Sequence, residues 1–270
     1  MDYGLKGKVA IVTGAAAHPT SFPYAGQGEE TARLLVQEGA KVVVADLNGE
    51  LCQALAQDLC GQGAEAISVR TDVTNPDDVK NLVDRALEAF GTVDILVNAA
   101  GCHGAAGKGS TFPNILLEDW DLIFNTHLKG TMLCTQEVAR RVMIPNRSGK
   151  IVNISSLVAH GKHGASAYCT AKAAISSFTV GCAVELGPYG INVNCVSPGL
   201  VMTPIWGSVG SGEALDLNKL AQDVKKGRVL EMDRPGMGKD IAHVIVFLVS
   251  EPGSYITADD INVSAGQVVY

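Results

Sequence analysis

The chain has 270 residues, of which 47% are hydrophobic and 5% aromatic, and its formal net charge is -7. This length suits one large α/β domain or two small ones, and an acidic chain without a basic run argues against nucleic-acid or anionic-membrane partners. The sequence has no apolar run of about 20 residues that could span a membrane, and it enters its first strand without a signal peptide.

The seven cysteines form no CxxC pair and have no spacing with histidine that would suit a metal ion. An odd number of cysteines, mostly inside apolar segments, predicts free thiols in a reducing compartment. Together with the lack of a targeting segment, this pattern indicates a cytoplasmic protein without a metal centre.

Short apolar runs alternate with segments of helical periodicity along the whole chain. In chain order we predict strand Lys8–Val12, helix Glu29–Glu38, strand Lys41–Ala45, helix Gly49–Cys60, strand Glu65–Val69, helix Asn75–Phe90, strand Val93–Val97, helix Leu117–Val142, strand Lys150–Ile154, helix Ala167–Leu186, strand Ile191–Val196, helix Lys239–Val249 and a last strand near Asp260–Val263. Continuous apolar strands that alternate with helices predict a parallel sheet covered on both faces. Because no linker or repeat interrupts the pattern, we expect one doubly wound domain over residues 1–270.

Folds of this class bind ligands beyond the carboxyl ends of their strands. Gly14, Gly26 and Gly28 follow the first strand, where glycines let the backbone approach a pyrophosphate and the next helix offers free N–H groups. Asp46 ends the second strand, where a carboxylate can accept hydrogen bonds from ribose hydroxyls and would repel a 2′-phosphate. Residues 47–49 offer no Arg or Lys for such a phosphate. The pattern therefore predicts NAD rather than NADP.

Tyr168 and Lys172 lie four residues apart, which places them on one face of the predicted helix Ala167–Leu186. An ammonium beside a phenol favours the ionised form of the phenol. A free Tyr titrates near pH ~10, too high for a base at neutral pH, so the pair suggests acid/base chemistry. Ser155 and Ser156 end the preceding strand and could hydrogen-bond a substrate oxygen.

The order and spacing of these motifs resemble the short-chain dehydrogenase/reductase family from about Lys6 to Gly266. The resemblance is carried by Thr13-Gly14, Gly26-x-Gly28, Asp46, Asp72-Val73, the run NAAG (98–101), the run IVNISS (151–156), Tyr168-x-x-x-Lys172 and the run VSPGLVMT (196–203). It implies a Rossmann-type fold with a seven-stranded parallel sheet. It also implies hydride transfer between a nicotinamide cofactor and an alcohol or carbonyl.

The resemblance further implies roles for individual residues. It assigns the adenine to Asp72 and Val73, the cofactor riboses to Asn98, Ala99, Gly101 and Lys172, and the nicotinamide carboxamide to Pro198, Val201 and Thr203. Tyr168 is the expected acid/base group. Ser156, the second serine of its pair, is expected to bind the substrate oxygen. Ser155 stays an alternative, because Ser156 stands one residue closer to Tyr168 than is common in the family.

The chain departs from the family at residue 127, where the stretch HLKG puts His127 in the place of a catalytic Asn. In the family, that Asn helps to hold a water that links the Lys to bulk solvent. A histidine could bond to that water or relay a proton itself, since it titrates near neutrality. The alternative is a histidine that only packs and hydrogen-bonds locally.

Two further departures concern loops. Residues His18–Ala25 form an eight-residue insertion in the glycine loop, which is either a lid over the cofactor or a surface bulge. Enoyl reductases of the superfamily also lengthen this loop, but their catalytic Tyr and Lys are more widely spaced. The second loop, Cys102–Asn114, is Gly-rich and should shape the substrate pocket together with the loop-rich segment at about 204–230. Four histidines near this end could bind a polar or anionic substrate: His18, His103, His160 and His163.

The sequence thus predicts an NAD-dependent alcohol dehydrogenase acting on a secondary alcohol that is small and polar, cyclic or polyol-like. An NADP-dependent carbonyl reductase is the alternative within the same class. A non-catalytic nucleotide-binding regulator is the alternative from another class, and the presence of both Tyr168 and Lys172 argues against it. By resemblance we expect a homo-oligomer, either a tetramer or a dimer, that pairs the long helices Leu117–Val142 and Ala167–Leu186.

Overall fold

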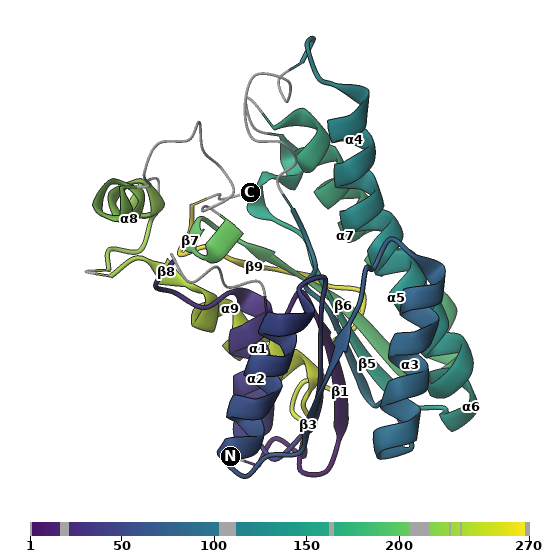
Figure 1. Cartoon of the computed structure of the whole chain (residues 1–270). Coiled ribbons are helices and arrows are strands. Elements are labelled where there is room, and N and C mark those ends of the chain that lie inside the picture. Colours follow the sequence, from purple (N-terminus) through teal and green to yellow (C-terminus); the bar gives the residue numbers. More distant parts are fainter. Residues whose placement is uncertain are drawn as a thin grey trace.

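The computed structural model describes residues 2–16, 22–102, 112–161, 165–205, 216–226, 228–232 and 234–267 (Figure 1). Its centre is a seven-stranded sheet with the strand order β3-β2-β1-β4-β5-β6-β9. The strands are β1 (Val9–Thr13), β2 (Lys41–Asp46), β3 (Ala66–Arg70), β4 (Ile95–Asn98), β5 (Gly149–Ile154), β6 (Ile191–Pro198) and β9 (Asp260–Val263). Every neighbouring pair is parallel, which confirms the predicted Rossmann-type sheet.

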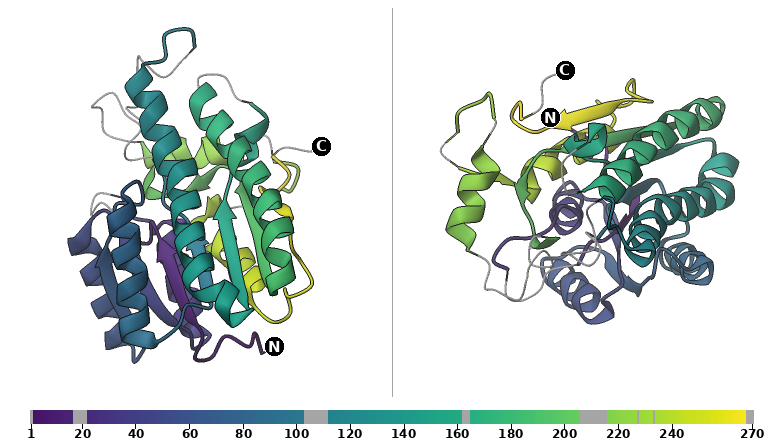
Figure 2. Two further views of the ribbon diagram at one scale, coloured as in Figure 1. Left: turned by 90° about the vertical axis from the view of Figure 1, so that its right-hand side faces the viewer. Right: turned by 90° about the horizontal axis from the view of Figure 1, so that it is seen from above.

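Helices cover both faces of this sheet, because the strands are apolar on both sides (Figure 2). Alternate residues of β1 point to opposite faces: Ala10 and Val12 join one buried cluster, whereas Ile11 joins the other. The first cluster includes side chains of α1 (Gln27–Gln37), α2 (Gly49–Gly61) and α9 (Gly238–Val249). The second includes side chains of α3 (Pro76–Phe90), α5 (Gly130–Val138) and α7 (Ser166–Leu186).

The ends of α3 show how local sequence sets the helix boundaries. Asn75 caps the helix by accepting a hydrogen bond from the Asp77 N–H, and Pro76 occupies the first turn. Gly91 ends the helix with φ 78°, a left-handed conformation that glycine adopts without strain. These three residues place α3 where the sequence predicted it.

The predicted helix Leu117–Val142 is longer and less regular than expected. It runs through α4 (Leu117–Phe124), the π-helical turn η1 (Asn125–Lys129), α5, a second π-helical turn η2 (Ala139–Met143) and α6 (Ile144–Asn146). The connecting residues keep right-handed helical angles, so the path is continuous. Turns of the π type often occur at functional sites, and η1 carries His127. Within the described ranges, none of the helices combines the length and apolar character needed to cross a membrane.

The segment at about 204–230 is not merely loop-rich, as the sequence suggested. Helix α8 (Leu217–Lys225) lies within it, capped by the Asp216 side chain, which accepts from the Asn218 and Lys219 N–H groups. A small second sheet pairs β7 (Val201–Met202) with β8 (Gly236–Met237). Each of these strands has two residues, too few to show a periodic pattern. The two strands that pair are also far apart in the chain, so the sequence did not predict this sheet.

Candidate functional site

The predicted site residues gather at the carboxyl edge of the sheet, where β1 and β4 lie side by side although they are distant in sequence. This reversal of strand order opens a crevice for ligands in doubly wound folds. Gly14 follows β1, Asp46 ends β2, Asn98 ends β4 and Ser155 follows β5.

The glycine loop is held by close backbone packing. Gly14 has φ 63°, and a Cβ atom on it would lie 2.6 Å from the Ala99 oxygen and the Ala100 Cα. A Cβ on Gly28 would overlap the Gly14 carbonyl. Gly26 has room for a side chain, with Pro204 Cδ at 3.7 Å, and as the N-cap of α1 it makes no side-chain cap bond. The N–H groups at the start of α1 therefore face the loop without a side-chain cap, which suits a phosphate group.

Asp46 is a buried residue rather than a solvated turn residue, with 9% of its surface exposed. Its carboxylate accepts hydrogen bonds from the Ala16 N–H at 3.2 Å and the Asn48 N–H at 3.1 Å. Burial raises the pKa of Asp46, and the backbone hydrogen bonds oppose that shift. The carboxylate thus joins the glycine loop to the turn after β2.

Arg70 is a residue that the sequence analysis missed. It lies on β3 in register with Asp46, so a cation stands on the strand next to the predicted ribose site. Its guanidinium contacts the Asp78 carboxylate at 3.1 Å. Only the strand register brings Arg70 opposite Asp46, and no local motif signals it.

Asp72, Val73 and Asn98 have clear structural contacts in addition to their predicted places near the cofactor. The Asp72 carboxylate accepts from the Thr74 N–H at 2.9 Å, which closes the turn before α3. Val73 packs where a side chain on Gly130 would otherwise stand. The Asn98 amide donates to Asn153 Oδ1 at 2.9 Å and to Thr135 Oγ1 at 3.1 Å, linking β4 with β5 and α5.

Tyr168 and Lys172 on α7 come together with Ser156, which follows β5. The Lys172 side chain is only 4% exposed, and its Nζ donates to the Ile154 carbonyl at 2.7 Å. The same Nζ lies 5.5 Å from the centre of the Tyr168 ring. The Ser156 side chain hydrogen-bonds with Tyr168. The structure therefore brings the predicted phenol, ammonium and hydroxyl into one group.

The two serines differ in their partners. The Ser155 hydroxyl is buried and donates to the Lys172 carbonyl at 2.8 Å, while Ser176 donates to Ser155 at 2.9 Å. Ser155 therefore fastens β5 to the backbone of α7. Because successive side chains of an extended chain alternate in direction, Ser156 points elsewhere and meets Tyr168.

Burial dominates the titration of both groups. It raises the pKa of Tyr168 to about 12, and the hydrogen bond from Ser156 opposes this shift. Burial also lowers the pKa of Lys172 to about 8. The sequence led us to expect a lowered Tyr168 pKa. The groups of the protein raise this pKa instead, because the cost of burying the phenolate outweighs the hydrogen bond from Ser156.

His127 is 1% exposed and packs its ring edge-to-face against Tyr168, with the ring centres 5.3 Å apart. Its Nε2 lies 2.6 Å from the Cys102 carbonyl oxygen and 3.1 Å from the Cys102 nitrogen. A protonated Nε2 can donate to that carbonyl, and a bare Nε2 can accept from that N–H. The shorter contact to the carbonyl oxygen favours the tautomer with the proton on Nε2, which donates to Cys102.

The remaining predicted residues lie along the segment that follows β5 and β6. Pro198 ends β6, Val201 lies in β7, and Thr203 follows β7; all three are buried. His160 lies in the 3-10 turn η3 (Leu157–His160). His18, His103 and His163 lie outside the described residues, as do the first half of the insertion and most of the loop 102–114. Within the described ranges, no cluster of His, Cys, Asp or Glu is arranged to hold a metal ion.

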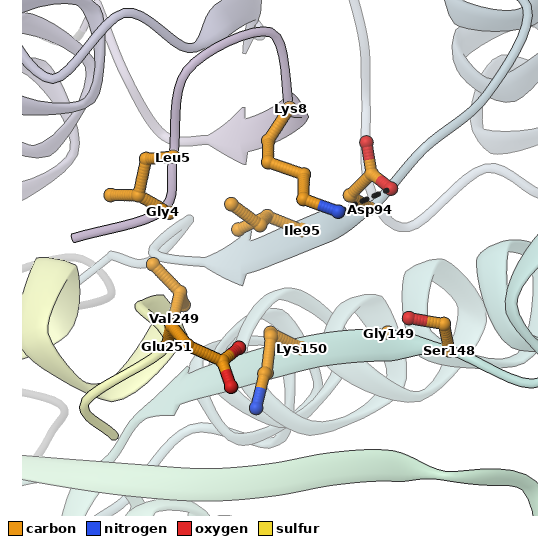
Figure 3. Close-up of a pocket in the computed structure, with 10 residues that line it drawn as sticks. All are labelled: Gly4, Leu5, Lys8, Asp94, Ile95, Ser148, Gly149, Lys150, Val249 and Glu251. Atoms are coloured by element: carbon orange, nitrogen blue, oxygen red, sulfur yellow. Dashed lines mark ion pairs between the residues drawn. The ribbon is translucent and has the colours of Figure 1, made fainter. Parts of the chain in front are cut away.

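A pocket on the opposite edge of the sheet takes no part in this site (Figure 3). It lies at the amino ends of β1, β4 and β5, where Lys8 pairs with Asp94 at 3.8 Å. Lys150 also lines it and donates to Asn192 Oδ1 at 2.7 Å. Neither Tyr168 nor the glycine loop contributes to its wall.

Comparison with known proteins agrees with this geometry. A family model described as enoyl-(acyl carrier protein) reductase matches residues 24–267. The (2S)-((R)-hydroxy(phenyl)methyl)succinyl-CoA dehydrogenase subunit BbsD of Thauera aromatica is 34% identical over 267 residues, covering 99% of each chain. The 3-oxoacyl-(acyl-carrier-protein) reductase FabG of Thermotoga maritima is 33% identical, covering 98% of this chain and 99% of the relative. Sorbitol dehydrogenase of Cereibacter sphaeroides is 33% identical, covering 97% of this chain and 98% of the relative.

Proposed function

Because the chain belongs to the short-chain dehydrogenase/reductase family, an oxidoreductase family with a nicotinamide cofactor, we propose that it is an NAD-dependent alcohol dehydrogenase. Its proposed substrate is a secondary alcohol, or the matching ketone, that is small and polar, cyclic or polyol-like. The observation that carries the proposal is the group formed by Tyr168, its hydrogen-bonded partner Ser156, and Lys172 one helical turn away.

The residues present fit a dinucleotide. Gly14, Gly26 and Gly28 would admit its pyrophosphate, since the loop has no side chains there and the start of α1 faces it. The other proposed contacts are Asp46, Asp72, Val73, Asn98, Ala99, Gly101, Tyr168, Lys172, Pro198, Val201 and Thr203. When bound, the nicotinamide supplies the position that accepts or returns the hydride.

The preference for NAD rests on Asp46. A carboxylate in this place would repel the 2′-phosphate of NADP and can accept hydrogen bonds from the ribose hydroxyls of NAD. Arg70 is the observation that favours the alternative, an NADP-dependent carbonyl reductase, because it stands on the next strand. One nitrogen of its guanidinium contacts Asp78, and the preference for NAD therefore rests on Asp46 alone.

In the proposed oxidation, Tyr168 as phenolate removes the hydroxyl proton while the hydride leaves the carbinol carbon. Ser156 donates a hydrogen bond to the substrate oxygen where charge develops. The Lys172 ammonium lies close enough to favour the phenolate, and the positive charge of an oxidised nicotinamide would act in the same direction. These two charges must overcome the burial that raises the Tyr168 pKa.

His127 is proposed to carry protons between this group and solvent. The support is its contact with the Tyr168 ring and the hydrogen bond between its Nε2 and the Cys102 backbone, together with the ability of histidine to titrate near neutrality. Local packing is the alternative role. In the His127→Asn variant, an unchanged pH–rate profile would leave packing as the remaining role.

The proposed assembly is a homo-oligomer, a tetramer or a dimer. Large apolar side chains are exposed along two neighbouring helices, with Leu117 and Leu122 on α4 and Val180 and Val184 on α7. Exposed apolar side chains on helices that the family pairs between subunits support an interface there. Light scattering of the purified chain tests it, and a monomer at micromolar concentration would contradict it.

A panel of alcohols and ketones, followed by NADH and NADPH absorbance, tests the proposed function. We expect NAD-linked oxidation of at least one secondary alcohol, at a higher kcat/KM than with NADP. A faster NADP-linked reaction would establish the carbonyl reductase instead. Tight NAD binding without turnover of any compound would favour a non-catalytic regulator. Reduction of an enoyl thioester is not expected, because Tyr168 and Lys172 are closely spaced.

A further inference from the structure

A small apolar cluster stands apart from the two clusters that cover the sheet. We call it the satellite cluster. Its residues are Phe22, Tyr24, Leu200, Met202, Leu217, Leu220, Ala221 and Met237. They come from the glycine-loop insertion, β7 and the residue before it, α8, and β8. The cluster therefore joins a segment beside the proposed cofactor site to the segment expected to shape the substrate pocket.

Phe22 lies at the centre of this contact. It is 2% exposed, and its ring packs edge-to-face against Tyr24 with the ring centres 5.7 Å apart. Met202 and Leu220 are the other buried members of the cluster. The described half of the insertion, residues 22–25, is thus packed into the protein at Phe22.

Helix α8 depends on this contact for its position. It has nine residues, too few to be stable in water without packing. Among its residues whose side chains the structure describes, Leu220 is the buried one, and it packs into the satellite cluster. Removing the Phe22 ring would therefore take away much of the surface that holds α8.

Ala25 and Gly26, which follow Phe22, pack against the start of α9. A Cβ atom on Gly238 would lie 2.9 Å from the Ala25 carbonyl oxygen and 3.2 Å from the Gly26 carbonyl carbon, so these backbones are in close contact. Gly28 packs directly on Gly14 in the same way. From Phe22 to Gly28 the chain thus forms a tightly packed connection between α8 and the turn after β1.

We propose that Phe22 is a positioning residue that couples dinucleotide binding at the glycine loop to the docking of α8. This inference rests on the proposed function, because it requires a dinucleotide at Gly14, Gly26 and Gly28. Binding that fixes the loop also fixes Phe22, and Phe22 holds the helix on the substrate side. By reciprocity, a docked α8 strengthens dinucleotide binding by the same factor.

Hydrogen–deuterium exchange of residues 217–225, with and without NADH, tests the coupling. In the wild-type protein NADH is expected to slow exchange in α8 by about tenfold, since local opening is what exposes these amides. In Phe22→Ala this effect of NADH should disappear, and the KM for the alcohol should rise about tenfold while kcat changes less. Phe22→Leu keeps an apolar side chain and should restore most of the effect.

Phe247→Ala is the matched control, because it removes a phenylalanine from the exposed side of α9. It should leave the response of α8 to NADH unchanged. Leu220→Ala removes the α8 side of the same contact and should show the same loss of the NADH effect as Phe22→Ala. The test therefore stays valid if one of the two variants folds poorly. Persistence of NADH-dependent protection in both alanine variants would overturn the coupling. A separate NADH fluorescence titration identifies the other failure: if the wild-type protein binds no NADH, the proposed function falls and the coupling falls with it.

Discussion

The polar site and the satellite cluster are built from opposite kinds of contact. Tyr168 and Lys172 lie on α7, a helix of 21 residues, and Ser156 follows the central strand β5. Hydrogen bonds fix these groups, as between Lys172 and the Ile154 carbonyl. The satellite cluster joins elements of two to nine residues through packed apolar side chains, besides the backbone pairing of β7 with β8. Directional bonds give the fixed geometry that proton transfer needs, whereas apolar contacts hold a helix with less geometric demand.

This difference predicts that substitutions in the polar site change kcat, while those in the satellite cluster change substrate affinity. The largest effect is expected for Tyr168→Phe, which removes the proton-transfer group and keeps the ring against His127. Loss of a general acid–base group lowers kcat by roughly 10²–10⁴-fold. Steady-state kinetics with NAD should show this loss, while NADH fluorescence should show binding within a few-fold of wild type.

Thr170→Ala is the control for Tyr168→Phe, because Thr170 lies on the same helix and is exposed. It should leave kcat near the wild-type value. Turnover by Tyr168→Phe at a rate close to wild type would remove Tyr168 from the chemistry and end the contrast between the two regions.

The second prediction concerns the stability of the polar site. Burial lowers the folded-state pKa of Lys172 to about 8 from an ordinary value of 10.5. Below pH 8 both states are protonated and the fold bears the full cost of the buried charge. Between pH 8 and 10.5 the unfolded chain binds more protons, so this group makes the unfolding free energy rise with pH. Lys172→Met should therefore stabilise the protein most below pH 8, by up to about 3 kcal/mol, since each pKa unit corresponds to ~1.4 kcal/mol.

Urea unfolding at pH 7 and pH 9.5 measures this difference. The gain from Lys172→Met should be smaller at pH 9.5, and the loss of the donor to the Ile154 carbonyl reduces it at both values. Lys239→Met, at an exposed position, is the control and should show no such trend. Above pH 10 the raised pKa of Tyr168 makes the unfolding free energy fall as the pH rises, because the unfolded chain loses its phenolic proton before the folded protein does. An equal gain at both pH values would contradict the prediction.

The third prediction separates the two neighbouring serines. Ser156→Ala should lower kcat by about 10²-fold, the usual effect of losing one donor to a developing charge, with little change in stability. Ser155→Ala should lower the unfolding free energy by about 0.5–1.5 kcal/mol, because it removes a buried hydrogen bond that fastens β5 to α7. Kinetics and urea unfolding of both variants measure the contrast. If Ser155→Ala has the larger kinetic effect, the assignment of Ser156 is wrong.

The sheet and the centre of the polar site could be predicted from the sequence, whereas features that depend on contacts between distant residues could not. The sheet was predictable because buried parallel strands are short apolar runs, such as KVVVA at 41–45. The Tyr168–Lys172 pair was predictable because helical spacing alone brings it together. Helix α8 was not, since its partner Phe22 is nearly 200 residues away in the chain. Arg70 opposite Asp46 depends on strand register, and the direction of the Tyr168 pKa depends on burial.

The smallest expected effect tests how tightly His127 is fitted into the polar site. A Cβ atom on Gly101 would lie 2.5 Å from His127 Cε1, so Gly101→Ala forces the imidazole to move. Overpacking of this kind costs about 1–3 kcal/mol of stability, and the displaced ring should also lower kcat through its contact with Tyr168. Asn is smaller than His, so the double variant Gly101→Ala with His127→Asn should recover stability relative to Gly101→Ala alone. A double-mutant cycle on the unfolding free energy measures this coupling. Strictly additive values would show that the two residues do not compete for the space beside Tyr168, and the polar site would then be less rigid than its hydrogen bonds indicate.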